Sequence, residues 1–211
     1  MDDAKRKSRK LAVDDVKREL IRSAAKTLFA DFGLEGASVR EIAKSAGYTT
    51  GAIYFHYANK EELYADILRE SLDQLLKEVQ GSHPNGDDPV AALSAGFRAL
   101  VRFYTENPRD LDLSLYLLNG ARPRGLTPAL NRELNAKLRA VLDIYRDHLA
   151  RAGVEEEHLN VEVGVLFDEM IGALVAAHTG RLKVIGTNLA SVVDRHTANL
   201  AQRLSRVKRR S

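Results

Sequence analysis

The sequence predicts an all-α fold of about nine helices. Along most of the chain, apolar residues recur at the 3.6-residue spacing of amphipathic helices. Capping residues or prolines stand where helices would begin, and glycines stand where several would end. No segment shows the alternation of apolar and polar residues that is typical of a strand. We therefore expect a small N-terminal domain of three helices and a larger C-terminal helical domain.

The N-terminal domain is expected to start with a long helix. Residues 1–13 are predicted to be a flexible basic arm, and a helix is predicted over residues 14–32. The apolar residues of that segment fall on one helical face. Gly33 stands where a glycine with positive φ would end the helix.

Two shorter helices are expected next. The first begins at Ser38, which is spaced to form a capping box with Glu41, and ends near Gly47. The second covers about residues 49–57. These three helices make up a predicted domain of residues 14–58.

The rest of the chain is expected to form one domain over residues 59–205, followed by a basic tail at 206–211. Asparagine, threonine or proline precedes or opens several of its helices, as N-caps and first-turn prolines do. Loops are expected at 82–88 and 120–125. The predicted helices cover residues 59–81, 89–106, 108–119, 128–149, 155–178 and 187–205.

Composition excludes several classes of protein. The chain has no cysteine, which excludes disulfides, thiolate metal sites and cysteine nucleophiles. It has no run of 18 apolar residues, so we expect no membrane span. The basic N-terminus lacks the apolar core of a secretory signal. We expect a cytoplasmic protein.

Charge is distributed unevenly along the chain. Residues 1–60 hold 12 basic and 8 acidic residues, whereas residues 61–202 hold 15 basic and 21 acidic residues. The tail from Arg203 holds five basic residues and no acid. A basic head on an acidic body suggests that a polyanion meets the head. For the tail alone, we favour a solvated charged terminus over a polyanion contact.

Residues 38–60 have the features of a helix-turn-helix. Such a motif needs a short capped helix, small residues where the helices cross, a glycine in the turn, and a second helix that fits the major groove of DNA. Ala43 and Gly47 supply the small residue and the turn. Thr49, Thr50 and Gly51 give the second helix a compact polar start that base edges could meet.

Residues 14–63 resemble the N-terminal domain of the tetracycline-repressor (TetR) family. The resemblance rests on the ending Phe-Gly of the first helix, the stretch SVREIA, the turn AGY, the block GAIYFHY and the segment NKEEL. It implies a DNA-binding homodimer on a near-palindromic operator, most often a repressor that a small molecule releases. It also implies that the last two helices form a four-helix bundle with a partner subunit.

The same resemblance implies the roles of individual residues. Tyr54 and Lys60 fall on phosphate-contacting positions, and we expect His56 to bind phosphate as well. Arg40 can reach a phosphate or a guanine edge. The positions where base contacts vary are Thr49, Thr50, Gly51 and Phe55.

Several of these positions have a structural alternative. Tyr54 could be a core aromatic, although DNA contact is favoured. Phe55 could equally contact bases or pack. Tyr57 reads as a core residue, and the arm can be a solvated tail or a groove binder.

The C-terminal domain is expected to dimerise and to bind a small, largely apolar effector. The segment 161–175 is apolar nearly all round, which predicts burial on two sides. The predicted dimer-interface residues are Ile171, Leu174, Val175, His178, Leu189, Val192 and His196. Polar groups on apolar faces suggest a pocket, and the predicted effector-binding residues are Tyr104, Tyr116, Tyr145 and Asp168.

Two other functions stay open at this point: a regulator without a ligand, and a helical-bundle enzyme. The enzyme reading rests on one Glu-x-x-His, Glu155 to His158. Di-iron bundles need that motif on two helices together with further inward glutamates. We therefore expect no enzyme, no cofactor and no metal. A pure scaffold protein would leave the helix-turn-helix unexplained.

Overall fold

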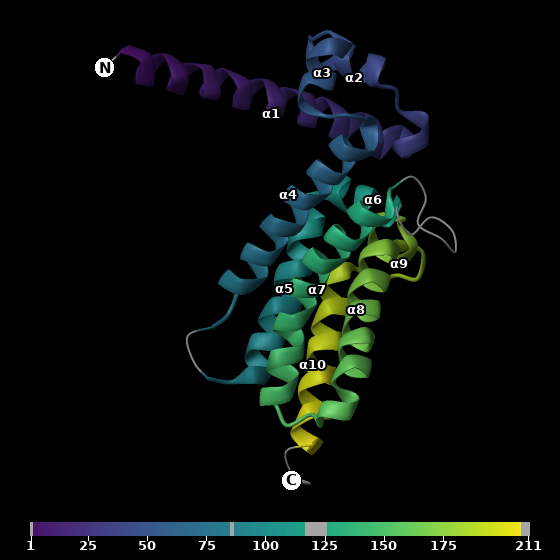
Figure 1. The fold of residues 1–211 in the computed structure, drawn as a ribbon. Helices are drawn as coiled ribbons and strands as arrows, with labels where there is room; N and C mark the ends of the chain where they lie inside the picture. The colour runs from purple at the N-terminus through teal and green to yellow at the C-terminus, as the bar shows by residue number, and fades with distance from the viewer. Residues whose placement is uncertain (1, 85–86, 117–125, 208–211) are drawn as a thin grey trace. The chain divides into compact units, whose positions relative to one another are not determined.

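The computed structural model describes the backbone of residues 2–84, 87–116 and 126–207, and the side chains of residues 9, 12–84, 87–115 and 126–205. Within these ranges the chain forms helices and turns and no strand (Figure 1). The all-α prediction is confirmed. None of the described helices has the length and apolar character needed to cross a membrane.

Internal contacts divide the chain into two compact units. The first consists of Met1–Ser71 and Arg109–Leu134, and the second of Leu72–Pro108 and Asn135–Ser211. The first unit therefore extends beyond the predicted domain 14–58. Polar contacts join its later segment to its earlier one. Among them, the Tyr64 hydroxyl donates to the Leu113 carbonyl at 2.6 Å, and Lys26 Nζ lies 2.6 Å from Asp110 Oδ2.

The N-terminal helix differs from the prediction. Helix α1 (Asp2–Gly36) is helical through the segment expected to be a flexible arm. Residues 2–32 contain no glycine or proline, and helix-favouring Ala, Lys, Arg and Leu dominate residues 4–12, so nothing in the sequence interrupts the helix there. Gly33, with φ 72°, interrupts the helical geometry at the predicted position.

The other helices of the first unit follow the sequence closely. Its core is apolar, with the rings of Phe29 and Tyr64 meeting edge to face at 5.1 Å between centroids. The helices are α2 (Val39–Ala46), α3 (Thr50–His56), the first part of α4 (Lys60–Gly81), α6 (Pro108–Tyr116) and the start of α7 (Pro128–Arg151). The predicted end of α6 at residue 119 and the loop at 120–125 lie outside the described residues.

The second unit is a bundle of longer helices. It contains the rest of α4 and α7, together with α5 (Pro89–Glu106), α8 (Glu156–His178), α9 (Arg181–Val184) and α10 (Leu189–Val207). Helix α9 was not predicted, because a helix of four residues is too short to show a helical period. It accounts for ten helices in the described chain where about nine were expected.

Candidate nucleic-acid interface

Helix α2 is fixed at both ends by the residues that predicted it. The Ser38 hydroxyl oxygen accepts a hydrogen bond from the Glu41 backbone N–H at 3.2 Å, and the Ser38 N–H donates to the Glu41 carboxylate at 3.2 Å. The hydrogen bonds from Ser38 lower the pKa of Glu41. At the other end Gly47 adopts φ 74°, a left-handed conformation that favours glycine, and turns the chain toward α3.

Helix α3 buries one face and exposes the other. Thr49 caps it, since its Oγ1 accepts from the Ala52 N–H at 3.3 Å. Ile53 is buried in the unit, whereas Tyr54 is 55% exposed and Phe55 is 77% exposed. Two adjacent exposed aromatics on a short helix give it a large outward contact surface that the protomer leaves uncovered.

The start of α3 lies open as well. Thr50 and Gly51 are exposed, and a Cβ built on Gly51 would meet only Thr49 Oγ1, at 3.8 Å. That is an ordinary contact, so packing within the protein does not require glycine at this position. Arg40 is exposed on α2, and His56 is half-buried at the end of α3.

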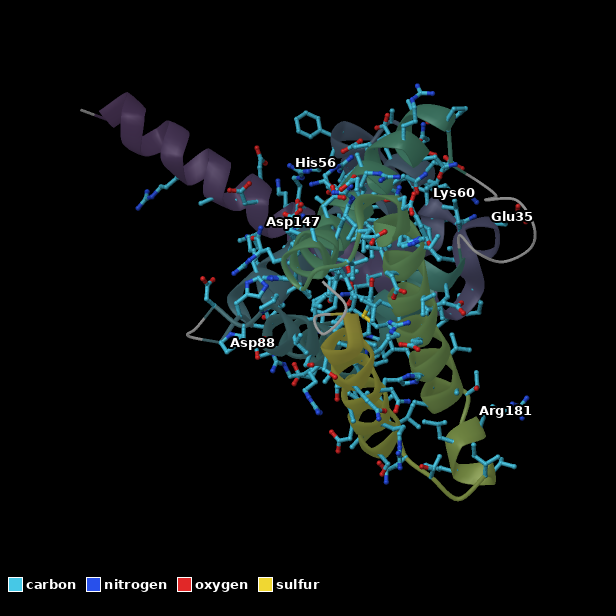
Figure 2. The ribbon with its side chains drawn as sticks, turned by 90° about the horizontal axis from the view of Figure 1, so that it is seen from below. Glu35, His56, Lys60, Asp88, Asp147 and Arg181 are labelled. Carbon is cyan, nitrogen blue, oxygen red and sulfur yellow. The ribbon has the colours of Figure 1, made fainter. Side chains whose placement is uncertain are left out.

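Lys60 has partners inside the protein. Its Nζ donates to the Glu35 carbonyl at 3.3 Å and to the Ala37 carbonyl at 3.4 Å, so it ties the start of α4 to the segment before α2. Figure 2 labels Lys60, Glu35 and His56. The predicted phosphate contact would share the ammonium group with these carbonyls.

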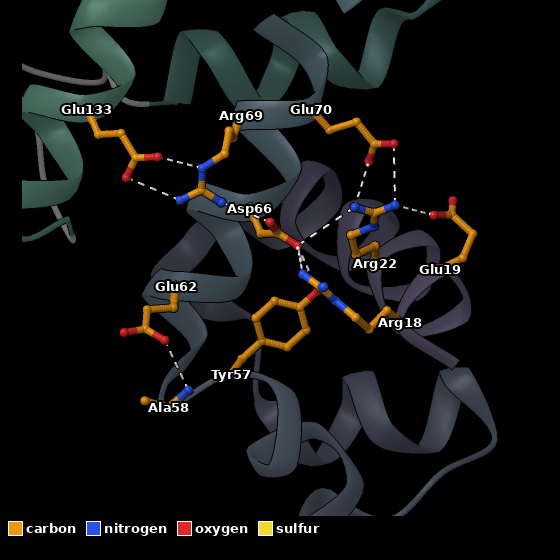
Figure 3. Close-up of polar contacts among 10 residues, drawn as sticks. All are labelled: Arg18, Glu19, Arg22, Tyr57, Ala58, Glu62, Asp66, Arg69, Glu70 and Glu133. Carbon is orange, nitrogen blue, oxygen red and sulfur yellow. Dashed lines mark hydrogen bonds and ion pairs between the residues drawn. The ribbon is translucent and has the colours of Figure 1, made fainter. Parts of the chain in front are cut away.

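Asp66, on α4, connects the residue after α3 to α1 (Figure 3). Sequence patterns did not single it out. Its carboxylate accepts hydrogen bonds from the Tyr57 hydroxyl at 2.8 Å, from Arg69 Nη1 at 2.8 Å and from Arg18 Nη2 at 3.3 Å. Arg22 Nη1 lies 3.8 Å away. Tyr57 is therefore a core residue, as predicted, and burial raises its pKa to about 12.

The network extends to α7. Arg69 Nε donates to Glu133 Oε1 at 2.6 Å, so the guanidinium of Arg69 lies between the carboxylates of Asp66 and Glu133. The Arg18 guanidinium also lies 5.7 Å from the centroid of the Tyr57 ring. Within the first unit, α1, the end of α3, α4 and the start of α7 are thus connected by charged hydrogen bonds.

Three of the predicted effector residues have described side chains, and Asp168 differs from the two tyrosines in burial. Tyr104 and Tyr145 are buried in the second unit, where the Tyr145 hydroxyl donates to the Gly96 carbonyl at 2.9 Å. Asp168 is exposed on α8 rather than buried, because its position faces away from the protomer's core. The Tyr116 side chain lies outside the described residues.

A groove lies elsewhere in the second unit, between α7 and α8. Its volume is about 590 Å³, within the usual range for small-molecule sites. Its walls combine apolar side chains with two arginines. The lining residues are Asn135, Leu138, Arg139, Leu142, Asp143, Arg146, Asn160, Val163, Gly164 and Phe167.

Most predicted dimer residues lie on partly exposed positions. His178 is exposed, and the half-buried members are Ile171, Val175, Leu189, Val192 and His196. Leu174 is an exception: it is only 2% exposed and packs in the protomer's own core, so its inclusion in the interface was wrong. The neighbouring outward face of α8 includes Val161, 66% exposed, and two glycines, Gly164 and Gly172, with open space around them.

The Glu-x-x-His segment lies at the surface. Ligand atoms of Glu155, Glu157 and His158 come within 4.8 Å of one another, and all three residues are exposed. This arrangement is not the buried, four-helix set of carboxylates that di-iron enzymes use.

Comparisons of sequence agree with this geometry. Residues 21–67 match the family model described as bacterial regulatory proteins, tetR family. The HTH-type transcriptional repressor KstR2 of Mycolicibacterium smegmatis is 40% identical over 81 residues, 38% of this chain and 39% of that protein. The HTH-type transcriptional regulator RutR of Escherichia coli is 30% identical over 128 residues, 60% of this chain and 57% of that protein. The matches thus span roughly two to three fifths of these relatives.

Solved structures match over almost the whole chain. A transcriptional regulator from Rhodococcus sp. Rha1 has a TM-score of 0.70 at 25% identity, over 88% of this chain and 96% of that one. The regulator FadR from Bacillus subtilis, solved in complex with stearoyl-CoA, has a TM-score of 0.71 at 18% identity, over 86% of this chain and 96% of that one. The family model covers the helix-turn-helix built above, so residues 21–67 form a domain of the tetR family of bacterial regulatory proteins, and the solved structures share the fold of the chain beyond it.

Proposed function

We propose that this protein is a sequence-specific DNA-binding transcriptional repressor, acting in the cytoplasm as a homodimer that a small molecule releases from its operator. The outward face of α3 carries the proposal. Tyr54 and Phe55 are large apolar groups that the protomer leaves in water, next to the exposed Thr50 and Gly51. A helix of this kind at the end of a capped helix-turn-helix fits the major groove of DNA.

We expect two kinds of contact to DNA, one to base edges and one to phosphates. Thr50, Gly51 and Phe55 would meet base edges, where hydroxyl and apolar groups discriminate between bases. Arg40, Tyr54 and His56 would donate to phosphates, which fixes the register without reading sequence. Thr49 would contribute mainly by capping α3, since its hydroxyl oxygen already accepts from the Ala52 N–H.

A dimer would place two such helices on one operator. The outward face of α8 supports this part of the proposal: Val161 is exposed, and Gly164 and Gly172 would let a partner helix approach closely. Helix α10 lies beside α8, where Arg203 and His196 meet Glu162 and Glu169 at 2.9 and 3.6 Å. Two α8–α10 pairs would form a four-helix interface with two-fold symmetry.

The groove between α7 and α8 is the effector site that we propose. Leu138, Leu142, Val163 and Phe167 suit a largely apolar ligand, and Arg139 suits an anionic end. It lies on the α7 flank of α8. Gly164 lines the groove and also belongs to the outward face proposed for the dimer, so a partner subunit would border one side of the groove. An acyl thioester such as the stearoyl-CoA seen with FadR has this chemistry.

Recovery of bound fragments from fragmented genomic DNA tests the DNA-binding function. We expect fragments that share a near-palindrome, with half-sites one helical turn apart, about 34–36 Å. Affinity for that sequence should fall steeply with salt. The variant Phe55→Ala should keep its helicity and lose preference for the operator over scrambled duplex. Equal retention of all sequences by the native protein would contradict the proposal.

The effector is tested by measuring operator affinity with acyl-CoA and fatty-acid ligands of increasing chain length. A ligand that weakens DNA binding tenfold must itself bind tenfold more weakly to the protein–DNA complex, a coupling of about 1.4 kcal/mol. Leu142→Arg should abolish the response, and Arg139→Gln should weaken it for anionic ligands only. A regulator without a ligand would show constant operator affinity throughout the series.

A further inference from the structure

Two histidines of the second unit meet within hydrogen-bonding distance. His83 lies in the loop after α4, and His148 lies on α7, 65 residues later. Their Nε2 atoms are 2.8 Å apart, and their rings meet edge to face with centroids 4.6 Å apart. Both side chains are half-buried.

A hydrogen bond between two imidazole Nε2 atoms needs one N–H group and one lone pair. The contact therefore exists only while one of the two Nε2 atoms is unprotonated. At low pH that lone pair is protonated, and two N–H groups then face each other, so the hydrogen bond is lost. Histidine is the side chain whose charge changes near neutral pH, so this loss falls within a physiological range.

The surroundings of His148 indicate which ring donates. His148 Nδ1 is buried and has no hydrogen-bond partner among the described residues. A proton on Nδ1 would bury an unpaired donor, so the proton of neutral His148 belongs on Nε2, which donates to His83. The same argument disfavours a metal here, since a ligating Nε2 would force the proton onto Nδ1, where metal-binding histidines normally have an acceptor.

The charged groups around the pair shift the pKa of His148 in opposite directions. Burial lowers the pKa of His148 most, the positive charges of His83 and Arg151 lower it further, and Asp147 raises it. Arg151 also forms an ion pair with Asp87 in the same loop. His83 and Asp87 are thus joined to α7 by one contact that depends on a neutral imidazole and by one that does not.

We propose that His83 and His148 form an acid-sensitive latch that holds the loop after α4 on α7 and opens when both Nε2 atoms are protonated. Because the contact uses an Nε2 lone pair, the joined histidines bind fewer protons than the same two side chains in the unfolded chain. The stability that the contact contributes is therefore present above the unfolded histidine value, about 6.5, and is lost as the pH falls. The latch is a property of the second unit and does not depend on the proposed function.

Thermal unfolding of the full chain at pH 7.5 and pH 5.0 tests the latch, with the variants His83→Ala, His148→Gln and their combination. At pH 7.5 we expect each single variant to unfold about 2–4 °C below the native protein, and the double variant to lose little more than either. At pH 5.0 the difference between native protein and single variants should disappear. His158→Gln is the matched control, because His158 is exposed, and should follow the native protein at both values.

Histidine titration by NMR gives a second, independent measurement. His148 should titrate below 6.5 in the native protein, and its midpoint should rise in His83→Ala. A coupling between the two variants that is equal at both pH values would overturn the proposal. An unchanged His148 midpoint would also overturn it, as would stabilisation by Zn²⁺ or Ni²⁺ that requires both histidines.

Discussion

The ammonium group of Lys60 is shared between the fold and the proposed ligand. Its two carbonyl partners, at 35 and 37, hold the segment that leads into α2. These partners lie 25 and 23 residues away in sequence, so the family resemblance indicated a phosphate contact and gave no sign of the internal role. A phosphate bound at Lys60 would therefore act on a group that already positions the helix-turn-helix.

We expect Lys60→Ala to weaken binding to operator and scrambled duplex alike. The slope of log affinity against log salt should fall by about one unit, because one phosphate contact is lost. The variant should also unfold at a lower temperature, since two carbonyl contacts disappear. Lys44→Ala, which removes an exposed charge from α2, is the control for net charge. A lower unfolding temperature with an unchanged salt slope would assign Lys60 to the fold alone.

A substitution at Gly51 distinguishes an effect on protein stability from an effect on DNA binding. A methyl group there would have only Thr49 Oγ1 nearby, at 3.8 Å, and alanine favours a helix over glycine by up to about 1 kcal/mol. We expect Gly51→Ala to unfold at the same or a slightly higher temperature and to bind the operator more weakly, because the methyl would occupy space needed by DNA. Mobility shift and thermal unfolding on one preparation measure both effects. Unchanged operator affinity would show that DNA does not approach Gly51 closely.

At the scale of the helices, the role of Asp66 is the clearest feature that sequence patterns did not predict. Its partners come from α1, from α4 and from the residue after α3, at separations of 48, 3 and 9 residues. Periodicity and capping are local signals, and they correctly predicted α2, α3 and α4. A charge network between helices leaves no such local signal. For the same reason the groove between α7 and α8 was missed while buried tyrosines were predicted to line a pocket.

The network predicts unequal effects for two aspartates on the same helix. Asp66→Asn removes the negative charge among three arginines, and we expect a loss of about 1–3 kcal/mol in the free energy of unfolding. Asp73, which pairs with Lys137 at 2.5 Å near the surface, is the matched control. Asp73→Asn should cost under about 1 kcal/mol. Urea denaturation measures both, and equal losses would show that the network adds nothing beyond a surface pair.

Operator affinity provides a second comparison of the same two variants. Asp66 accepts from the Tyr57 hydroxyl directly after α3, so Asp66→Asn should also loosen the end of the reading helix and reduce affinity. Asp73→Asn should leave affinity unchanged. Together the two measurements distinguish a positioning role in the first unit from a general loss of stability.

At the scale of the whole molecule, the sequence predicted the class of fold and the reading head but placed one interface residue wrongly. Helix α8 is apolar on several sides, and composition alone does not say which side faces the protomer's own core. Burial assigns Leu174 to that core and leaves Val161, Gly164 and Gly172 outward. A charge at Leu174 would therefore unfold the protomer and reveal nothing about dimerisation.

Gly172 offers a cleaner test of the dimer. A Cβ added there meets no atom within 4 Å in the protomer, and the position is exposed, so Gly172→Glu should fold with unchanged helicity. In a dimer through α8 the same side chain would place bulk and charge in a close helix contact, and burying an unpaired carboxylate is costly. Gly81→Glu is the matched control, because Gly81 also has open space around it and ends α4, away from α8.

We expect light scattering at low micromolar concentration to give a dimer for the native protein and Gly81→Glu, and a monomer for Gly172→Glu. Operator affinity should fall with the dimer, by about 10²-fold or more, because two linked reading heads bind far more tightly than one. Binding to a single half-site should be nearly unchanged, since the helix-turn-helix is untouched. If Gly172→Glu is still a dimer, the dimer interface lies on another face of the molecule. If the native protein is a monomer with full operator affinity, the proposed dimer is wrong.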